Sequence, residues 1–432
     1  MSDYMFMLES HLTAGEARVL ADVQAAAAEA NVNLFLAGGA MRDMLGGFVI
    51  RDLDFTVEGN SVKLARKLAQ KTGAKILAVD DHRKCVELLF PGNVTAEIGM
   101  ARQERFPKPG GRAQVSPATI YEDLKGRDFT VNSIALSLNK SSRGLLLDPN
   151  NGLADLEHKE LRAITNYTLY DEPVRVLRLI RFKVRLGFTI SAKTEAQYRA
   201  VREAGLESKI GPRSLLHELT QIAAEANAVE VVRALDQEGL LRLFSPALTG
   251  QKVNLAGLTR LQKARQFVPF GVDFQIENTG LFLSILTEKL TPKEKSAMAA
   301  ALKMEKPEID AWQKLDTRVK KLETALKSPR LQKPSLVYKA LENVPGEEIL
   351  FLYLRTGVRV VQDRIRNYLQ RYLPTAQEVT EADVAAPAGV EKGSPKYAKF
   401  HQAAIAARLD ARPKKTSPAP EPEPQAAASA RK

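Results

Sequence analysis

The chain has 432 residues, a formal net charge of +12 and a pI of about 9.5, with 44% hydrophobic and 26% charged residues. It is too long for one compact core, so we expect roughly two to four domains with the composition of an ordinary soluble protein. The charge favours a polyanionic partner, and the single Cys85 excludes an internal disulfide framework and a cysteine-based zinc cluster.

The first residues, MSDYMFMLESH, lack a basic segment followed by an apolar core. No apolar run approaches the roughly 20 residues that cross a bilayer. We therefore expect no signal peptide and no membrane partner. A single free cysteine suits a reducing compartment, so the expected location is cytoplasmic.

Residues 13–31 are rich in alanine, with apolar spacing near 3.6, and predict a helix. The apolar residues 34–36 then predict a buried strand, which breaks at Gly38 and Gly39. A short helical segment carrying Arg42 and Asp43 follows. The glycines allow backbone amides to approach a phosphate closely, and Arg42 adds a fixed cation beside them.

The next strand, RDLDFTV, carries Asp52 and Asp54 one residue apart. Side chains alternate across a strand, so both carboxylates are expected on the same face. Two like charges held so close favour a divalent cation between them, and hard oxygen ligands suit Mg²⁺. Either feature alone is ordinary, since Asp-x-Asp and Gly-Gly are common in strands and turns. Combined in one β-turn-α-β unit, they indicate nucleotidyl transfer.

Helices and strands continue to alternate, which predicts a small α/β domain of about 145 residues. Residues 61–73 predict an amphipathic helix ended by Gly73, and the runs AKILAV, CVELLF and VTAEIGMA predict strands. Glu97 lies in the last of them, where it would complete a metal site, act as a base for an attacking hydroxyl, or simply face solvent. Residues 102–117 are rich in Pro, Gly and charge, and predict a mobile loop over substrate or a disordered connection.

The segment IYEDLKGRDFTVNSIALSLN contains Arg127, Asp128 and Asn132. Arg127 is suited to hold a phosphate, and Asp128 and Asn132 to hydrogen-bond a sugar hydroxyl. The alternative is a helix start capped by Asp128 or Thr130. Residues 145–164 then predict a strand, a DPNNG turn and a charged helix, at which the first domain ends.

From residue 164 onward the sequence is helical. Arginines recur at steps of three, three and four on one predicted helix, at Arg175, Arg178, Arg181 and Arg185. Asp171 and Glu172 lie about one turn before Arg175, so a carboxylate–guanidinium pair that reads the edge of a base is sterically reasonable. A solvated charged face is the alternative.

Amphipathic helical segments continue to residue 373, and His217 and Trp312 are expected to be structural. The basic stretch RVKKLETALKSPRLQK suits a nucleic-acid backbone, although an exposed helix explains it equally. Residues 411–432 are rich in Pro, Ala and charge and predict disorder.

These motifs, in this order, resemble the bacterial tRNA nucleotidyltransferase and poly(A) polymerase family, the second class of CCA-adding enzymes among the polymerase-β-like nucleotidyltransferases. The resemblance runs motif by motif from about residue 30 to about residue 245, and returns weakly in residues 384–411. The first family motif matches Gly38, Gly39, Arg42, Asp43, Asp52 and Asp54. The second, tied to ribose recognition, matches RDFTVNSIAL; the third, a flexible connection, matches DPNNGLADLE. The fourth, an amino-acid template for the incoming base, matches DEPVRVLRLIRF, and the fifth, a neck helix element, matches GPRSLLHEL.

The resemblance implies an α+β fold in four parts. These are a small mixed-sheet nucleotidyltransferase head (1–147), a neck that recognises the base (148–220), a helical body and tail that bind tRNA (221–410), and a disordered tail (411–432). It implies that Asp52 and Asp54 are catalytic and bind two Mg²⁺ ions, and Glu97, from its place in the strand VTAEIGMA, is the third predicted catalytic residue. The implied nucleotide-binding residues are Gly38, Gly39, Arg42, Arg127, Asp128, Asn132, Asp171, Glu172, Arg175, Arg178 and Arg181.

The implied activity is template-independent addition or repair of the 3′-terminal CCA of tRNA, or of CC or A alone, from CTP and ATP with release of pyrophosphate. A poly(A) polymerase and an RNA-binding protein without catalysis are the alternatives, although plain RNA binding needs no pair of carboxylates. The segment FTVEGNSVKLARKLA is more similar to members that add only CC or only A. Two positions depart from the family: Gly126 replaces an arginine, and Glu172 replaces the aspartate that faces the base.

Overall fold

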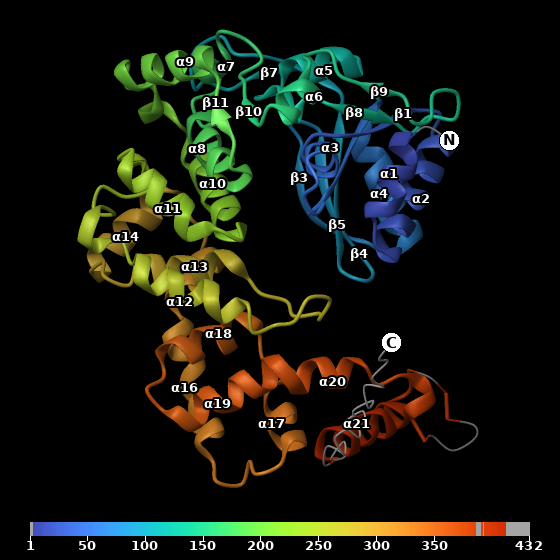
Figure 1. Cartoon of the computed structure of the whole chain (residues 1–432), viewed down its shortest axis with the longest axis vertical. Helices are drawn as coiled ribbons and strands as arrows, with labels where there is room; N and C mark the ends of the chain where they lie inside the picture. The colour runs from blue at the N-terminus through green and yellow to red at the C-terminus, as the bar shows by residue number, and fades with distance from the viewer. Residues whose placement is uncertain (1–2, 386–389, 392, 412–432) are drawn as a thin grey trace, which may run out of the picture. The chain divides into compact units, whose positions relative to one another are not determined.

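The computed structural model describes residues 3–385, 390–391 and 393–411, which divide into two compact units (Figure 1). The first contains the chain up to Gln262 together with Asn278–Gln313; the second contains Lys263–Glu277 and the chain from Lys314 onward. Apart from Ala411, the tail predicted to be disordered lies outside the described residues. Within the described part, no helix has the length and apolar character needed to span a membrane. The limits of the four predicted parts stay predictions, and "head" and "neck" below mean residues 3–147 and 148–220.

A seven-stranded mixed sheet forms the head, in the order β3-β4-β5-β2-β1-β8-β9. Its strands are β1 Asn33–Ala37, β2 Leu53–Glu58, β3 Lys75–Asp80, β4 Cys85–Phe90, β5 Val94–Met100, β8 Ala135–Ser137 and β9 Leu146–Leu147. Strands β2 and β5 pair in parallel, whereas the other neighbours are antiparallel. The predicted strands and the mixed sheet are therefore confirmed.

Helices α2 (Ala14–Glu29) and α4 (Ser61–Thr72) pack against each other and against the sheet (Figure 1). Thr13 starts α2 with a reciprocal capping box, and Gly73, at φ +73°, ends α4 as predicted. Helix α5 (Ile120–Gly126) contributes to a separate apolar cluster made of Phe35, Ala37, Ile120, Leu124, Ala135 and Leu147. Burial between these layers fixes the strands that carry the candidate site.

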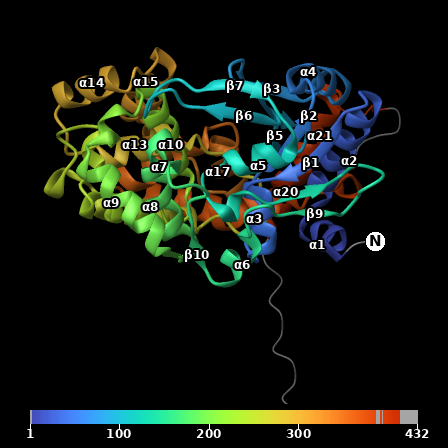
Figure 2. The ribbon, with the colours of Figure 1, turned by 90° about the horizontal axis from the view of Figure 1, so that it is seen from above.

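The segment 102–117 is not the irregular loop that its composition predicts. Strands β6 (Arg102–Arg105) and β7 (Gln114–Pro117) pair as an antiparallel hairpin (Figure 2), so the expectation of a mobile or disordered connection is wrong for them. Glu104 on β6 anchors the hairpin, since its carboxylate accepts hydrogen bonds from Arg83 at 3.1 Å and Arg102 at 2.7 Å. Pro107, Pro109, Gly110 and Gly111 lie in the turn between the strands, and Pro117 ends β7.

The neck is mainly helical, as expected, and also contains one short parallel strand pair, β10 Glu160–Leu161 with β11 Thr189–Ile190. Its helices are α6 Gly152–Glu157, α7 Thr168–Asp171, α8 Arg175–Leu186, α9 Ala192–Glu203 and α10 Pro212–Ala224. The alternative helix start near Thr130 is only a single 3₁₀ turn, Thr130–Asn132, without a side-chain cap.

The head also contains α1 Asp3–His11 and α3 Gly39–Leu45. The remaining helices that lie wholly in the first unit are α11 Ala228–Gln237, α13 Asn278–Leu286, α14 Pro292–Ala301 and α15 Lys306–Gln313. Trp312 is buried there and donates to the Thr287 hydroxyl at 3.0 Å, which confirms a structural role. Helix α12 (Leu255–Arg265) runs into the second unit.

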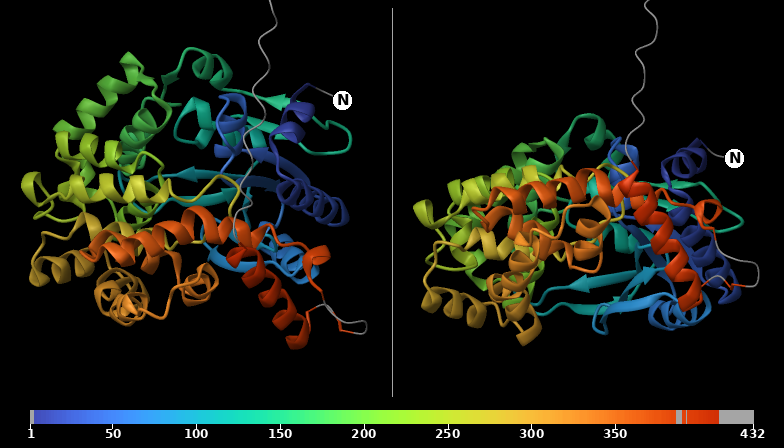
Figure 3. Two further views of the ribbon diagram at one scale, coloured as in Figure 1. Left: turned by 60° about the horizontal axis from the view of Figure 1, so that its bottom comes forward. Right: turned by 90° about the horizontal axis from the view of Figure 1, so that it is seen from below.

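The second unit is helical (Figure 3), with α16 Leu315–Lys327, α17 Pro334–Leu341, α18 Gly346–Arg355, α19 Arg359–Asn367, α20 Leu373–Gln377 and α21 Pro395–Asp410. The basic segment RVKKLETALK lies on α16, which buries Leu315, Val319, Leu322 and Leu326 and leaves its lysines at the surface. Its contact with nucleic acid stays a prediction.

Candidate active site

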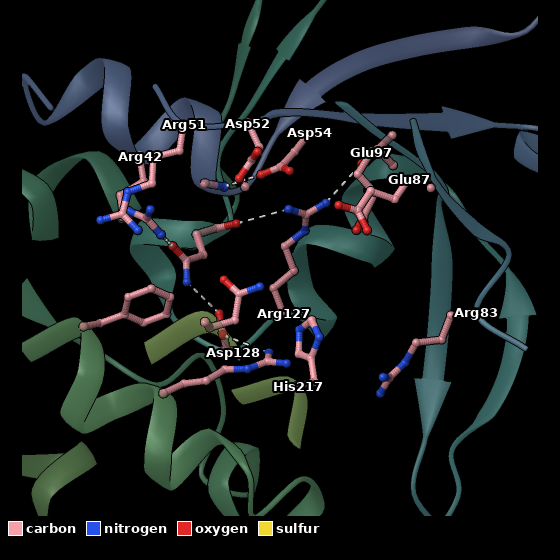
Figure 4. Close-up of a pocket in the computed structure, with 18 of the residues that line it drawn as sticks. Arg42, Arg51, Asp52, Asp54, Arg83, Glu87, Glu97, Arg127, Asp128 and His217 are labelled. Atoms are coloured by element: carbon pink, nitrogen blue, oxygen red, sulfur yellow. Dashed lines mark hydrogen bonds and ion pairs between the residues drawn. The ribbon is translucent and has the colours of Figure 1, made fainter. Parts of the chain in front are cut away.

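One cavity of about 670 Å³ collects residues from the head and the neck (Figure 4). The predicted site residues that line it are Gly38, Gly39, Arg42, Asp52, Asp54, Glu97, Arg127, Asp128, Asn132, Glu172, Arg175, Arg178 and Arg181. Asp171 is the exception, because it is not part of the lining; its carbonyl accepts the Gly110 N–H at 3.2 Å. The fold therefore brings together motifs that are far apart in the sequence.

The carboxylates gather because of the strand register. The parallel pairing of β2 and β5 sets Asp54 beside Glu97, and the antiparallel pairing of β4 and β5 sets Glu97 beside Glu87. Asp52 immediately precedes β2 and accepts a hydrogen bond from the Thr95 hydroxyl. Figure 4 shows Asp52 and Asp54 side by side, with Glu87 and Glu97 next to them. Glu87 was missed in the sequence analysis, because a glutamate on a strand carries no signal before the register is known.

Burial, reinforced by the charges of Glu97 and Asp52, raises the pKa of Asp54 to about 7. Arg127 and Arg42 act in the opposite direction but do not cancel this effect. In the described part of the chain, no set of three or more His, Cys, Asp or Glu side chains has the arrangement of a formed metal site. The aspartate pair is nevertheless short of positive charge, and its hard oxygen donors fit a divalent cation such as Mg²⁺.

Two glycines allow Asp54 to sit where it does. The Gly39 N–H donates to Asp54 Oδ2 at 3.0 Å, and a Cβ on Gly39 would lie 3.0 Å from the same oxygen. Gly38 has φ +68°, and a Cβ there would lie 2.7 Å from Nη1 of Arg127. Since the Gly38 N–H also donates to the Ile134 carbonyl, both amides have protein acceptors. Their predicted contact with a phosphate stays a prediction.

Asp128 and Asn132, predicted to hydrogen-bond a sugar hydroxyl, form one hydrogen-bonded chain with Arg42, predicted to lie beside a phosphate. Arg42 Nη1 donates to Asn132 Oδ1 at 2.7 Å, and Asn132 Nδ2 donates to Asp128 Oδ1 at 2.9 Å. Burial works to raise the pKa of Asp128, but Arg178, Arg175 and these hydrogen bonds hold it below its usual value. The carboxylate therefore stays ionised and oriented. Arg127 is held by Asp123, at 2.9 Å from Nη2 to Oδ2, and its Nη1 donates to the Asn132 carbonyl at 3.4 Å.

Glu172 and Arg175 form the ion pair predicted at the start of α8, with Arg175 Nε 3.0 Å from Glu172 Oε2. The second oxygen, Oε1, accepts a hydrogen bond from Arg83 Nη2 at 2.8 Å. Burial opposes ionisation, yet the charges of Arg175, Arg178 and Arg83 lower the pKa of Glu172 to about 2. At Gly126, a departure from the family, a Cβ would meet nothing within 4 Å, and the carbonyl accepts from Arg175 Nη2 at 3.2 Å.

Several cavity residues escaped the sequence analysis. Arg83 carries no motif of its own, and only its long-range partner reveals it. Glu218 lies in the motif GPRSLLHEL, but only its bond to Arg181 shows that it belongs to the cavity. His217, expected to be structural, lines the cavity (Figure 4), and its role stays a prediction. Burial, together with the positive charge of Arg178, lowers the pKa of His217, so its imidazole is neutral at neutral pH.

Comparison with known proteins agrees with this geometry. Residues 34–162 match the family model of the poly A polymerase head domain. This match spans the part of the chain that carries the first three motifs, and it agrees with the resemblance that those motifs indicated.

Among individual relatives, the chain is 26% identical to an A-adding tRNA nucleotidyltransferase of Geobacter sulfurreducens, over 94% of this chain and 47% of that one. It is 33% identical to a CC-adding tRNA nucleotidyltransferase of Deinococcus radiodurans, over 48% of this chain and 54% of that one. The chain thus spans about half the length of each of these relatives. An apo structure of a CCA-adding enzyme, 22% identical, matches with a TM-score of 0.55 over 96% of both chains, which establishes a shared fold.

Proposed function

We propose that this chain is a template-independent tRNA nucleotidyltransferase that transfers AMP from ATP to a tRNA 3′ end terminating in CC. One observation carries the proposal. The Asp52, Asp54 and Glu97 carboxylates line the same cavity as the Glu172–Arg175 pair. A nucleotide bound in this cavity can therefore place its triphosphate at the carboxylates and its base at the Glu172–Arg175 pair. Restriction to A is supported by the extent of similarity, which covers nearly the whole chain for an A-adding relative and about half of it for a CC-adding one.

The reaction joins the RNA 3′-oxygen to the α-phosphorus of ATP and breaks the bond to pyrophosphate, while the hydroxyl proton is released. A divalent cation, Mg²⁺ by the donor set, supplies charge that favours the alkoxide and the pyrophosphate leaving group. Asp52 and Asp54 would hold that cation, and the Gly39 amide fixes the Asp54 side chain through its hydrogen bond to Oδ2. Glu97, which pairs with Asp54 in the strand register, would take up the hydroxyl proton.

Base selection would depend on Glu172 and Arg175. Adenine offers an amino donor and a ring-nitrogen acceptor on its pairing edge, which match a carboxylate acceptor and a guanidinium donor side by side. Cytosine offers a similar edge, so the pair alone does not separate the two bases. We expect discrimination between adenine and cytosine to depend on how rigidly Arg83 and Arg175 hold the Glu172 carboxylate. A Glu172–Arg175 pair with a fixed position leaves room for a base of only one ring size.

The proposal is tested with tRNA transcripts that lack CCA, end in C, or end in CC, each given ATP, CTP or both with Mg²⁺. Products are read at single-nucleotide resolution. We expect one nucleotide added to the CC-ending transcript with ATP, and no growth of the other transcripts with CTP. Growth of every transcript to CCA would make the chain a complete CCA-adding enzyme, and a long adenylate ladder would make it a poly(A) polymerase. If no transcript incorporates a nucleotide, the proposal is wrong and the alternative of an RNA-binding protein without catalysis remains.

A further inference from the structure

Glu225, the residue that follows α10, has a fully buried side chain surrounded by three arginines. Its Oε2 accepts a hydrogen bond from Arg51 Nη2 at 2.6 Å, and its Oε1 accepts one from Arg181 Nη1 at 3.0 Å. The third arginine, Arg185, places Nε 3.8 Å from Oε2. Burial opposes ionisation, but the arginines hold the pKa of Glu225 below its usual value. Such a carboxylate is tolerated only because its partners compensate for lost water.

Arg51 connects this buried carboxylate to the acidic site. It immediately precedes Asp52, and Figure 4 shows the two residues next to each other at the cavity. Its side chain is 34% exposed, whereas that of Glu225 is 0% exposed, so the pair has one end at the cavity and the other in the interior. The main chain at Asp52 is therefore tied to the end of α10.

A second path joins the same carboxylate to the head through α3. Arg185, which faces Glu225, donates to Asp43 Oδ2 at 2.6 Å, and the other oxygen of Asp43 lies 2.7 Å from Arg42 Nη2. Arg42 continues to Asn132 at 2.7 Å, where the ribose-site hydrogen bonds begin. Both paths therefore run from one residue of the helical region to the polar residues of the head.

A third series of ion pairs and hydrogen bonds, made by residues of α8 and α10, joins Asp128 back to Glu225. Asp128 lies 3.4 Å from Arg178 Nη1, and Arg178 Nε lies 3.6 Å from Glu218. Glu218 accepts from Arg181 Nε at 2.6 Å, and Arg181 binds Glu225. Arg181 and Arg42 also place their guanidinium carbons 4.6 and 5.0 Å from the ring centre of Phe182, which fills the space beside these interactions. We call this closed set of interactions the head–neck ring.

We infer that Glu225 is a positioning residue for nucleotidyl transfer, an inference that rests on the proposed function. Through Arg51 it fixes the main chain at Asp52, and through the head–neck ring it holds the base-reading helix α8 in register with the carboxylates. A shift of about 1 Å between reacting groups costs on the order of a hundredfold in rate. The Glu225 side chain is fully buried and does not line the cavity, so its loss should lower turnover without weakening ATP binding.

The test compares Glu225→Gln, Arg51→Met and the double variant in ATP addition to a CC-ending tRNA, well below each melting temperature. We expect kcat to fall about 10- to 100-fold in each single variant, with KM for ATP changed less than about twofold. The double variant should be no slower than the slower single one, since both act through one contact. Additive losses would mean that Arg51 acts on substrate by itself, and unchanged kcat would reduce the ring to a structural role; either result overturns the inference.

Amide hydrogen exchange of the full chain supplies a readout that needs neither RNA nor ATP. We expect faster exchange in residues 49–58 of both single variants, and parent-like exchange in Glu29→Gln, which disturbs only the exposed pairs with Lys67 and Lys71. Unchanged exchange at residues 49–58 would overturn the inference. A parent protein that adds no nucleotide would instead overturn the proposed function, while the exchange result still decides whether Glu225 fixes this segment.

Discussion

Glu172 of the neck accepts a hydrogen bond from Arg83 of the head at 2.8 Å while it binds Arg175, the first residue of α8, at 3.0 Å. Both oxygens of the carboxylate proposed to read the base are thus held by arginines. Arg83 comes from the turn between β3 and β4 and also binds Glu104 of the hairpin. A base that hydrogen-bonds to Oε1 must therefore share that oxygen with Arg83 or displace it.

Replacing Arg83 by Met removes this competitor. The Arg83 side chain is partly exposed, so the pair is worth about 1 kcal/mol, and we expect KM for ATP to fall about three- to tenfold. Arg83→Lys, which keeps the charge, should behave like the parent. The measurement is steady-state addition of AMP to a CC-ending tRNA, and a KM that rises would show that Arg83 binds the nucleotide rather than competing with it.

The pH dependence of stability provides a second check on the same carboxylate. The folded-state pKa of Glu172 is about 2, below the usual 4.5, so folding favours the ionised form. Its contribution is fully present above pH 4.5 and is lost as the pH falls toward 2; it amounts to at most about 3 kcal/mol. In denaturant unfolding, the stability difference between the parent and Glu172→Gln should shrink as the pH falls through this window. A difference that is constant from pH 7 to pH 3 would contradict the assigned pKa.

Gly38 offers a test of the turn that positions Asp54. Gly38→Ala must adopt a left-handed backbone and place its Cβ 2.7 Å from Arg127 Nη1. Gly47 has a similar φ of +72°, but a Cβ there meets nothing within 4 Å. Gly47→Ala should therefore lower the free energy of unfolding only by the backbone term, about 1 kcal/mol. We expect Gly38→Ala to be the less stable of the two by roughly 1–2 kcal/mol and to lose most nucleotidyl transfer. Equal melting temperatures and activities would contradict the close packing at Gly38.

Much of this architecture was predictable from local sequence. Apolar runs predicted β1 and β2, the Asp-x-Asp spacing predicted adjacent carboxylates, and Glu97 was expected near them. Glycine punctuation also predicted the end of α4. These features depend on residues close together in the chain, where periodicity and turn chemistry act directly.

Features that depend on distant partners were not predictable. Arg83 lies 89 residues before Glu172, and Arg51 lies 174 residues before Glu225. In the sequence, these residues cannot be told from charged residues exposed to solvent, because only the fold shows that they are in contact. The β6–β7 hairpin was missed for a similar reason. Its Pro- and Gly-rich turn suggested irregular structure, whereas the hydrogen bond that Glu104 accepts from the distant Arg83 stabilises its strands.

The crowded carboxylates predict an effect on stability that needs no catalytic assay. Since burial, Glu97 and Asp52 all disfavour the charge on Asp54, we expect Asp54→Asn to melt at a higher temperature than the parent in EDTA. The asparagine oxygen still accepts the Gly39 N–H. Added Mg²⁺ should raise the melting temperature of the parent and leave that of the variant nearly unchanged. Equal responses of the two proteins to Mg²⁺ would contradict cation binding at Asp54.

The most direct test of the central claim is the product of one reaction, a CC-ending tRNA incubated with ATP and Mg²⁺, with the parent and with Asp52→Ala. We predict that the parent adds exactly one adenylate and that Asp52→Ala, folded and still bound to tRNA, slows the addition at least a thousandfold. A product that carries no adenylate, or a variant as active as the parent, would contradict the assignment of this cavity as a nucleotidyl-transfer site.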